Sequence, residues 1–201
     1  MEHLFEKSCQ YAINCHSGQK RKDGTIYILH PIEVTSIAST MTSDEEVLSS
    51  AMLHDVVEDC NIDIEEIVNL FGARVGKIVA LETEPKYSDL SKSESWKLRK
   101  EEALTRLKVA DDIGFKIVFL ADKLANIRSI YREFQKKGID SFNMFNVHDV
   151  NEHAWYYFNV LENVSELKET DAYNEYEIKI NLIFNNLKKE EVINGKRNNI
   201  I

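Results

Sequence analysis

The sequence predicts an all-α protein. Apolar residues recur at helical spacing along most of the chain, strand-like alternation is almost absent, and no internal repeat or low-complexity linker interrupts the pattern. With 201 residues, 43% of them apolar, the chain can build one substantial core. We therefore expect a single domain over residues 1–188. Residues 189–201, rich in Asn and Lys, are expected to form a flexible tail.

Short helices are expected through the amino-terminal part. The first covers residues 2–16, and a polar loop bracketed by Gly18 and Gly24 leads from it to His30. Pro31 can begin the next helix, over 31–40, because the first turn does not need its missing amide hydrogen. Three more helices are expected: one over 45–59 capped by Ser43 or Asp44, one capped by Asn61 or Asp63 that ends near Gly72, and one that follows Gly76 and stops before Pro85.

The second half of the chain is expected to hold longer helices. Residues 95–109 are amphipathic and basic. The apolar run 115–121 would suit a strand if taken alone, but the helical spacing continues to Phe134, which favours one buried helix. The order is completed by a short turn or helix over 139–146, a long helix over 147–167 and a last helix over about 172–188.

The composition argues against several classes of protein. A formal net charge of −9 repels polyanions, so a general binder of nucleic acid or of anionic membranes is not expected. The chain has neither a run of eighteen apolar residues nor a basic-then-apolar leader, so neither a membrane span nor secretion is expected. Cys9, Cys15 and Cys60 are odd in number and lack the C-x-x-C spacing, which indicates reduced thiols. These features predict a cytoplasmic protein.

Positive charge is nevertheless concentrated in two places. One is the loop at residues 20–22, close to His30 at a rigid loop-to-helix junction, where a phosphorylated ligand could enter. The other begins at residues 97–100 and continues to Lys108. The second place can be either a phosphate-binding surface or the solvated face of an amphipathic helix.

Residues 53–59 concentrate polar side chains within an apolar helix. On one continuous helix Glu58 lies one turn beyond His54, and Asp59 one turn beyond Asp55, so an imidazole and three carboxylates share one edge. Three neighbouring carboxylates cannot all stay ionised without a cation, and burying them unpaired would cost several kcal/mol. A bound metal ion resolves both problems. The plainer alternative is a satisfied helix histidine beside a solvated helix end.

Two distant segments supply further ligands, His30 and Asp122. With His54 and Asp55 they provide two nitrogens and two oxygens, which suits one borderline divalent ion with positions left for water and substrate. The residues alone do not exclude zinc, iron or magnesium, although two imidazoles weigh against magnesium. Such an ion acidifies a bound water and offsets phosphoryl charge, so phosphoester hydrolysis is expected.

Three polar residues beside these ligands have expected roles in that hydrolysis. Glu58 would take the proton from the attacking water. Asp59 would orient that water or hold a ligand in place. Asn126, one turn after Asp122, would bind the substrate near its leaving oxygen or its sugar.

Three strings, in this order, resemble a known family: residues 18–25 with Tyr27 and His30-Pro31, then 53–59, then 120–128. Together they resemble the hydrolase domain of the RelA/SpoT-type alarmone enzymes, within the HD phosphohydrolase superfamily, and especially the free-standing small alarmone hydrolases. The similarity spans about residues 1–165. It implies an HD-domain helical bundle of about eight to ten helices.

The resemblance implies a (p)ppGpp 3′-pyrophosphohydrolase, a phosphoric diester hydrolase that leaves GDP or GTP. It assigns the metal role to His30, His54, Asp55 and Asp122 and suggests one Mn²⁺. It also implies that Arg21 lies flat against the base and Lys22 near base or phosphate. Ile26 stands where the family usually has Pro, which leaves the pose of Arg21 less constrained. A homo-oligomer is compatible with the sequence.

Alternatives remain open at this level. Related substrates are (p)ppApp, the 2′-phosphate of NADPH, and 5′-monophosphates. Two-metal phosphodiesterases need histidines between the first His-Asp and the last Asp, and none lies between His54 and Asp122, which favours one metal. A nucleotide-sensing module without activity is the non-enzyme alternative. The presence of all six metal and acid positions weighs against it.

Overall fold

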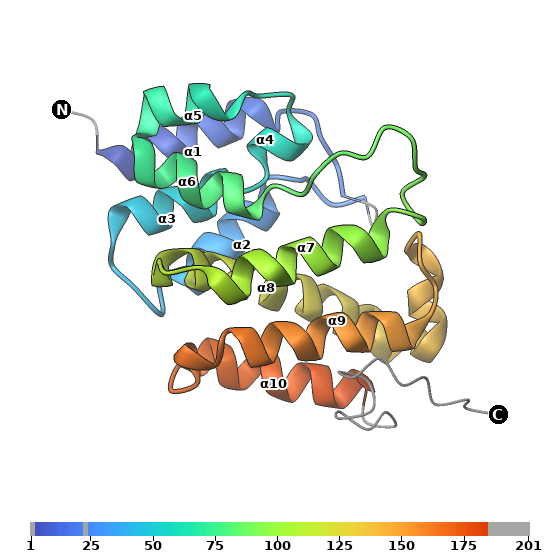
Figure 1. The fold of residues 1–201 in the computed structure, drawn as a ribbon. Coiled ribbons are helices and arrows are strands. Elements are labelled where there is room, and N and C mark those ends of the chain that lie inside the picture. The colour runs from blue at the N-terminus through green and yellow to red at the C-terminus, as the bar shows by residue number, and fades with distance from the viewer. Residues whose placement is uncertain (1–2, 22–23, 185–201) are drawn as a thin grey trace. The chain divides into compact units, whose positions relative to one another are not determined.

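The fold is helical throughout the described part of the chain (Figure 1). The computed structural model describes residues 3–21 and 24–184. In these ranges it has α-helices α1 to α10, two short 3-10 helices, η1 and η2, and a single β-bridge, between Lys20 and Ile26. The all-α prediction is confirmed. The tail expected at 189–201 lies outside the described residues.

The chain divides into two compact units. The first unit comprises residues 1–84 and 110–125, and the second comprises residues 85–109 and 126–201. Helix α8, Ile113–Lys137, contributes its first half to the first unit and its second half to the second. The expected single domain over 1–188 stays a prediction.

Helix α3 is the packing centre of the first unit, where it contacts α1, α2 and α6. The side chains of Met52 and Leu53, at the end of α3, belong to a buried apolar cluster with α4, α5 and α6. The junction between α3 and α4 is therefore held in place by core packing. The helices of this unit besides α8 are α1 Leu4–Cys15, α2 Leu29–Ala38, α3 Glu45–Leu53, α4 Val56–Asp59, α5 Ile64–Phe71 and α6 Ala73–Glu82.

Local chemistry explains where these helices begin. Asp44 caps α3, because its side chain accepts a hydrogen bond of 3.0 Å from the Glu46 amide. Gly72, with φ of +99°, separates α5 from α6. The helix expected after Gly76 starts earlier, at Ala73, so that boundary was wrong. Gly76 lies inside α6, where the two helices pack so closely that a Cβ would come within 2.3 Å of Val68 Cγ2.

The continuous helix expected over 45–59 was also wrong. Helix α3 ends at Leu53, and α4 begins at Val56. His54 Nδ1 lies 2.8 Å from the Ala51 carbonyl oxygen, the acceptor that a continuous helix would offer to the Asp55 amide. The side chain thereby competes with the helix at this point. His54 and Asp55 consequently occupy a junction between two helices.

The second unit is organised around α9, which packs against α7 and α10. Lys97 of α7 forms an ion pair of 2.6 Å with Glu152 of α9 and lies over the Trp155 ring, so part of the basic segment serves packing inside this unit. None of the helices in the described ranges combines the length and apolar character needed to cross a membrane. The elements besides α8 are α7 Trp96–Val109, η1 Gly138–Met144, α9 Val150–Asn163, η2 Ser165–Leu167 and α10 Asp171–Phe184.

Candidate metal centre

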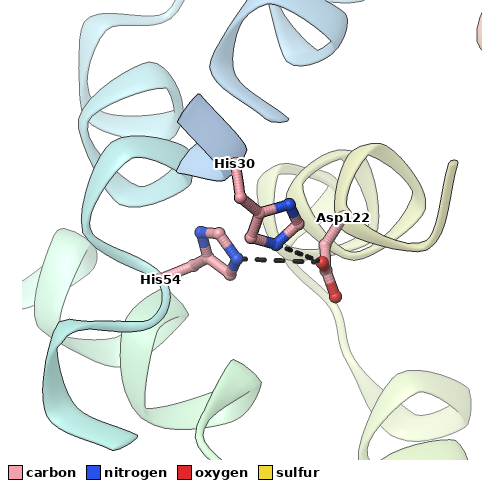
Figure 2. Close-up of side chains that lie close together, drawn as sticks. All are labelled: His30, His54 and Asp122. Atoms are coloured by element: carbon pink, nitrogen blue, oxygen red, sulfur yellow. Dashed lines mark ion pairs between the residues drawn. The ribbon is translucent and has the colours of Figure 1, made fainter. Parts of the chain in front are cut away.

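Four side chains from three separate segments meet within the first unit. His30 lies in the first turn of α2, His54 and Asp55 lie at the junction of α3 and α4, and Asp122 lies on α8. His30, His54 and Asp122 are buried, and Figure 2 shows their side chains turned toward one another. The cluster therefore forms only when the unit folds.

The distances between these side chains suit ligands of one ion. Asp122 Oδ1 lies 3.1 Å from His30 Nε2 and 3.8 Å from His54 Nε2. Asp55 Oδ2 lies 3.2 Å from His54 Nε2 and 3.6 Å from His30 Nε2. Two ligands that bind one ion through bonds of about 2.1 Å are roughly 3.0–3.4 Å apart, so two of these distances match, and the other two, 3.6 and 3.8 Å, are slightly longer. One ligand atom from each of His30, His54 and Asp122 falls within 4.8 Å of the other two, so these residues could hold a metal ion.

The hydrogen bonding of His54 leaves one nitrogen for an ion. Its Nδ1 faces the Ala51 carbonyl oxygen, which can only accept, so Nδ1 carries a proton. In the neutral ring Nε2 then presents a lone pair toward the carboxylates. This buried atom has no hydrogen-bond partner in the part of the chain that the structure describes. A cation beside it would satisfy the lone pair and the carboxylate oxygens together.

The electrostatics of the cluster also call for positive charge. Burial alone would lower the pKa of His54, but Asp55, Asp122 and Glu82 outweigh burial and raise it to about 10. Burial would raise the pKa of Asp122. The charge of Lys123 and the hydrogen bond from His30 outweigh burial and hold this pKa well below its usual range. Without an ion, the His54 imidazole would thus keep a proton, whose positive charge partly balances the carboxylates. The donor set fits a divalent metal.

Glu82 is an acidic neighbour that the sequence did not single out. It ends α6 and is buried, and its Oε1 has no hydrogen-bond partner within the described ranges. Burial raises its pKa to about 8; Lys123, whose Nζ lies 3.9 Å from Glu82 Oε2, opposes the shift, while Asp122 adds to it. The sequence signal, a lone acid closing the apolar run 78–82, is too common to mark a site.

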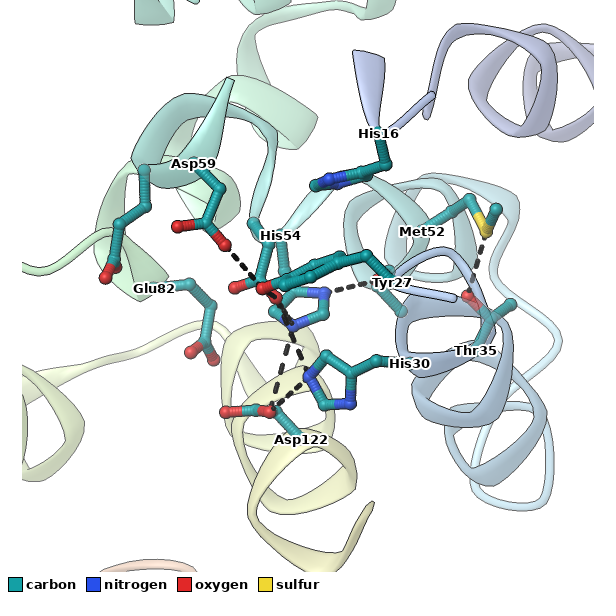
Figure 3. Close-up of polar contacts among 12 residues, drawn as sticks. His16, Tyr27, His30, Thr35, Met52, His54, Asp59, Glu82 and Asp122 are labelled. Atoms are coloured by element: carbon teal, nitrogen blue, oxygen red, sulfur yellow. Dashed lines mark hydrogen bonds and ion pairs between the residues drawn. The ribbon is translucent and has the colours of Figure 1, made fainter. Parts of the chain in front are cut away.

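The two predicted catalytic acids lie beside the cluster. Glu58 Oε2 accepts a hydrogen bond of 3.1 Å from the Glu84 amide. Burial raises the pKa of Glu58, although the hydrogen bond from Glu84 by itself would lower it. The charges of Asp55 and Asp59 add to the rise. Asp59 Oδ2 accepts a hydrogen bond from the hydroxyl of Tyr27, which also contacts Asp55 (Figure 3). A carboxyl with a raised pKa is suited to proton transfer near neutral pH.

The predicted substrate-binding residues are placed less completely. Arg21 lies in a closed loop, where its amide donates to the Thr25 carbonyl oxygen at 2.9 Å and its own carbonyl oxygen accepts from the Gly24 amide. Lys22 lies outside the described residues. Asn126 lies one turn after Asp122 on α8, but it belongs to the second unit. The substrate roles of all three stay predictions.

The fold and these side chains define a class: an all-α protein with a buried centre of mixed imidazole and carboxylate groups, able to hold a divalent ion. The chain belongs to the HD domain family, whose model matches residues 8–143. This match includes every residue that the sequence assigned to the centre.

Relatives of known structure and sequence extend the comparison. The chain resembles the solved structure of a metazoan ortholog of SpoT, described as hydrolysing ppGpp, with a TM-score of 0.68 and 28% identity over 92% of this chain and 96% of that one. It is 36% identical over 129 residues to the GTP pyrophosphokinase rsh of Brucella ovis, covering 64% of this chain and 17% of that protein. It is 34% identical over 129 residues to the guanosine-3′,5′-bis(diphosphate) 3′-pyrophosphohydrolase of Vibrio cholerae, covering 63% and 18%. The chain thus spans less than a fifth of these curated relatives.

Proposed function

We propose that this protein is a metal-dependent guanosine-3′,5′-bis(diphosphate) 3′-pyrophosphohydrolase. The observation that carries the proposal is the meeting of His30, His54, Asp55 and Asp122 at distances suited to one ion. The likeness to the metazoan SpoT ortholog, which extends over most of both chains, supports the choice of substrate. The family alone would leave the substrate open, since HD domain folds serve several reactions.

The four residues of the centre would hold one divalent ion, and we infer Mn²⁺. When bound, the ion would lower the pKa of a nearby water and offset negative charge on a phosphoryl oxygen. His54 would hold the ion through Nε2, because its Nδ1 proton is directed to the Ala51 carbonyl oxygen. Asp55 and Asp122 would supply the negative charge that imidazole ligands lack.

Glu58 would act as the general base, and Asp59 would orient the water. Glu58 is partly buried beside Asp55, and its raised pKa lets it hold the transferred proton. The hydrogen bond from Glu84 fixes one carboxylate oxygen and leaves the other for the water. Positioned proton transfer of this kind contributes typically about 10²- to 10⁴-fold to a rate.

Arg21, Lys22 and Asn126 would bind the nucleotide. A planar guanidinium at Arg21 can stack on a base, whereas the ammonium of Lys22 acts as a point charge toward phosphate. Asn126 can both donate and accept a hydrogen bond. A small anionic nucleotide is the inferred partner, and the expected setting is the cytoplasm.

A product assay tests the proposal directly. The full chain, loaded with Mn²⁺, is incubated separately with ppGpp, pppGpp, ppApp, NADPH and GMP, and pyrophosphate, orthophosphate and nucleotides are quantified. The expected products are pyrophosphate with GDP or GTP, and an Asp122→Asn variant should produce neither. Absence of pyrophosphate from both ppGpp and pppGpp would overturn the substrate. If NADPH were the one substrate hydrolysed, with release of orthophosphate, the enzyme would act on a 2′-phosphate instead of ppGpp.

A further inference from the structure

Tyr27 links a candidate metal ligand to a candidate catalytic acid. Its hydroxyl lies 2.7 Å from Asp55 Oδ2 and also forms a hydrogen bond with Asp59 Oδ2. Asp55 belongs to the metal centre, whereas Asp59 is exposed at the end of α4. Figure 3 shows the Tyr27 side chain between Asp59 and the histidines of the metal centre. One hydroxyl therefore contacts two carboxylates to which different roles are assigned.

The surroundings of Tyr27 hold its ring in place. The His16 ring stacks on it with a centroid distance of 4.7 Å and an angle of 18°, and the His30 ring meets it edge-on. The Tyr27 amide donates to the Gln19 carbonyl oxygen at 3.1 Å. These contacts fix both the ring and the backbone, so the hydroxyl has little freedom to follow a moving partner.

Gln19 joins the same loop to the end of α4. Its Nε2 donates to the Asp59 carbonyl oxygen at 3.3 Å, and its Oε1 lies 2.9 Å from Nδ1 of the buried His16. Cys60 Sγ approaches the same His16 nitrogen at 3.4 Å. Two side chains thus join the loop that carries Tyr27 to the end of α4: Gln19 bonds to the backbone of Asp59, and Tyr27 to its carboxylate.

The hydroxyl has one proton for two carboxylate oxygens. A phenol donates a single hydrogen bond, so it cannot fully satisfy Asp55 and Asp59 at the same time. A cation held by Asp55 would satisfy the Asp55 oxygen and leave the hydroxyl proton to Asp59. We propose that Tyr27 is a positioning residue that couples occupation of the metal centre to the orientation of Asp59.

This inference rests on the proposed function for its kinetic part only. Loss of the hydroxyl, as in Tyr27→Phe, keeps the stacked ring but releases Asp59. We expect kcat for ppGpp to fall about 10- to 100-fold, as for other groups that orient catalytic ligands, with KM changed less than about twofold. The affinity for Mn²⁺, measured by calorimetric titration without substrate, should rise, because the hydroxyl no longer competes with the cation for Asp55 Oδ2.

Tyr11→Phe is the matched control. The Tyr11 hydroxyl donates to Glu66 Oε1 at 2.6 Å, a tyrosine–carboxylate hydrogen bond between α1 and α5. That variant should keep the wild-type kcat and Mn²⁺ affinity. If Tyr27→Phe behaves like Tyr11→Phe in both measurements, the coupling role of Tyr27 is excluded.

A double-mutant cycle with Asp59→Asn separates positioning from a merely structural role. If Tyr27 acts through Asp59, the losses of kcat in the two single variants are not additive in the double variant. Additive losses would overturn the proposal. Should Tyr27→Phe fail to fold, Mn²⁺ titration of Asp59→Asn remains decisive, because an affinity equal to wild type would also overturn the coupling. If the wild type does not hydrolyse ppGpp but Tyr27→Phe binds Mn²⁺ more tightly than the wild type, the substrate assignment fails and the link between Tyr27 and Asp55 stands.

Discussion

Two clusters of carboxylates in the first unit resemble each other in composition and differ in burial. In the Arg74 cluster, one guanidinium contacts Asp112 through Nε at 2.9 Å and Asp44 and Glu46 through one amino group at 2.6 and 3.1 Å. The metal centre holds Asp55 and Asp122 beside two imidazoles, with Glu82 as a buried acidic neighbour whose pKa is raised to about 8. Each cluster holds three acidic side chains, but only the first contains a guanidinium at its middle.

The difference in solvent access explains what each cluster requires. The side chains of Asp44 and Glu46 are 37% and 42% exposed, so water offsets the charge that Arg74 leaves unbalanced. The side chains of Asp122 and Glu82 are 7% and 3% exposed, and Lys123 pairs with both. Asp55 and Asp112 are alike, at 20% and 19%, so the contrast rests on the other two acids of each cluster. Excess negative charge is tolerated at a surface but needs a counter-ion in the interior. The Arg74 cluster is therefore structural, and the buried cluster is suited to bind a cation.

Exchanging Asp for Asn in each cluster should have opposite consequences, and this gives the largest expected effect. Asp55→Asn should lose Mn²⁺ and turnover, with kcat/KM lowered by at least about 100-fold, since even the loss of an outer partner of a metal ligand costs about 10- to 100-fold. Asp112→Asn should keep both. Metal analysis of the purified proteins and initial rates with ppGpp measure the contrast. Full turnover in Asp55→Asn would remove Asp55 from the coordination sphere.

Glu58→Gln should separate holding the ion from transferring the proton. The amide can still accept the hydrogen bond from Glu84, but it cannot accept a proton from water. We expect an unchanged Mn²⁺ content and a kcat lowered about 10²- to 10⁴-fold. Single-turnover kinetics on Mn²⁺-loaded protein provide the measurement. A kcat equal to wild type would move the base role to another residue.

The meeting of the four candidate ligands could be predicted because the chemistry of a ligand is local to each residue. The residue types, their order and the resemblance to the HD family point to His30, His54, Asp55 and Asp122, and none of these signals depends on the exact path of the backbone. The structure brings them together although the continuous helix expected over 45–59 is divided into α3 and α4. The His54 side chain bonds to the Ala51 carbonyl oxygen, which a continuous helix would offer to a backbone amide. The spacing of apolar residues along the chain does not reveal this competition between a side chain and the backbone.

The residues that sequence reasoning missed depend on tertiary contacts. Tyr27 stood within a recognised string, but its two carboxylate partners come from the junction of α3 and α4 and from the end of α4. Glu82 has no distinguishing neighbours along the chain, and the charged groups around it, Lys123 and Asp122, come from α8. Spacing along one helix carries no information about such contacts.

Arg74→Ala should affect stability without affecting the chemistry. The variant removes the cation that joins the start of α3 to Asp112, in the segment before α8. Because these groups are partly exposed, we expect a loss of about 1 kcal/mol in the free energy of unfolding rather than the several kcal/mol of a buried pair. Urea denaturation measures the loss, and kcat should stay within about twofold of wild type. A large fall in kcat at unchanged stability would contradict the structural role.

The smallest effect expected is on the acid limb of stability. Hydrogen bonds from Arg74 lower the pKa of Asp44 and Asp112 below their usual value, against a smaller opposing effect of burial. A carboxyl whose pKa is lower in the folded state stabilises the protein above the unfolded pKa, about 3.9, and loses that contribution as pH falls through the folded value. Below about pH 4 the wild type should therefore lose more stability per pH unit than Arg74→Ala. Melting temperatures between about pH 5 and 2 test this, and parallel acid limbs would show that the guanidinium does not hold these carboxylates ionised.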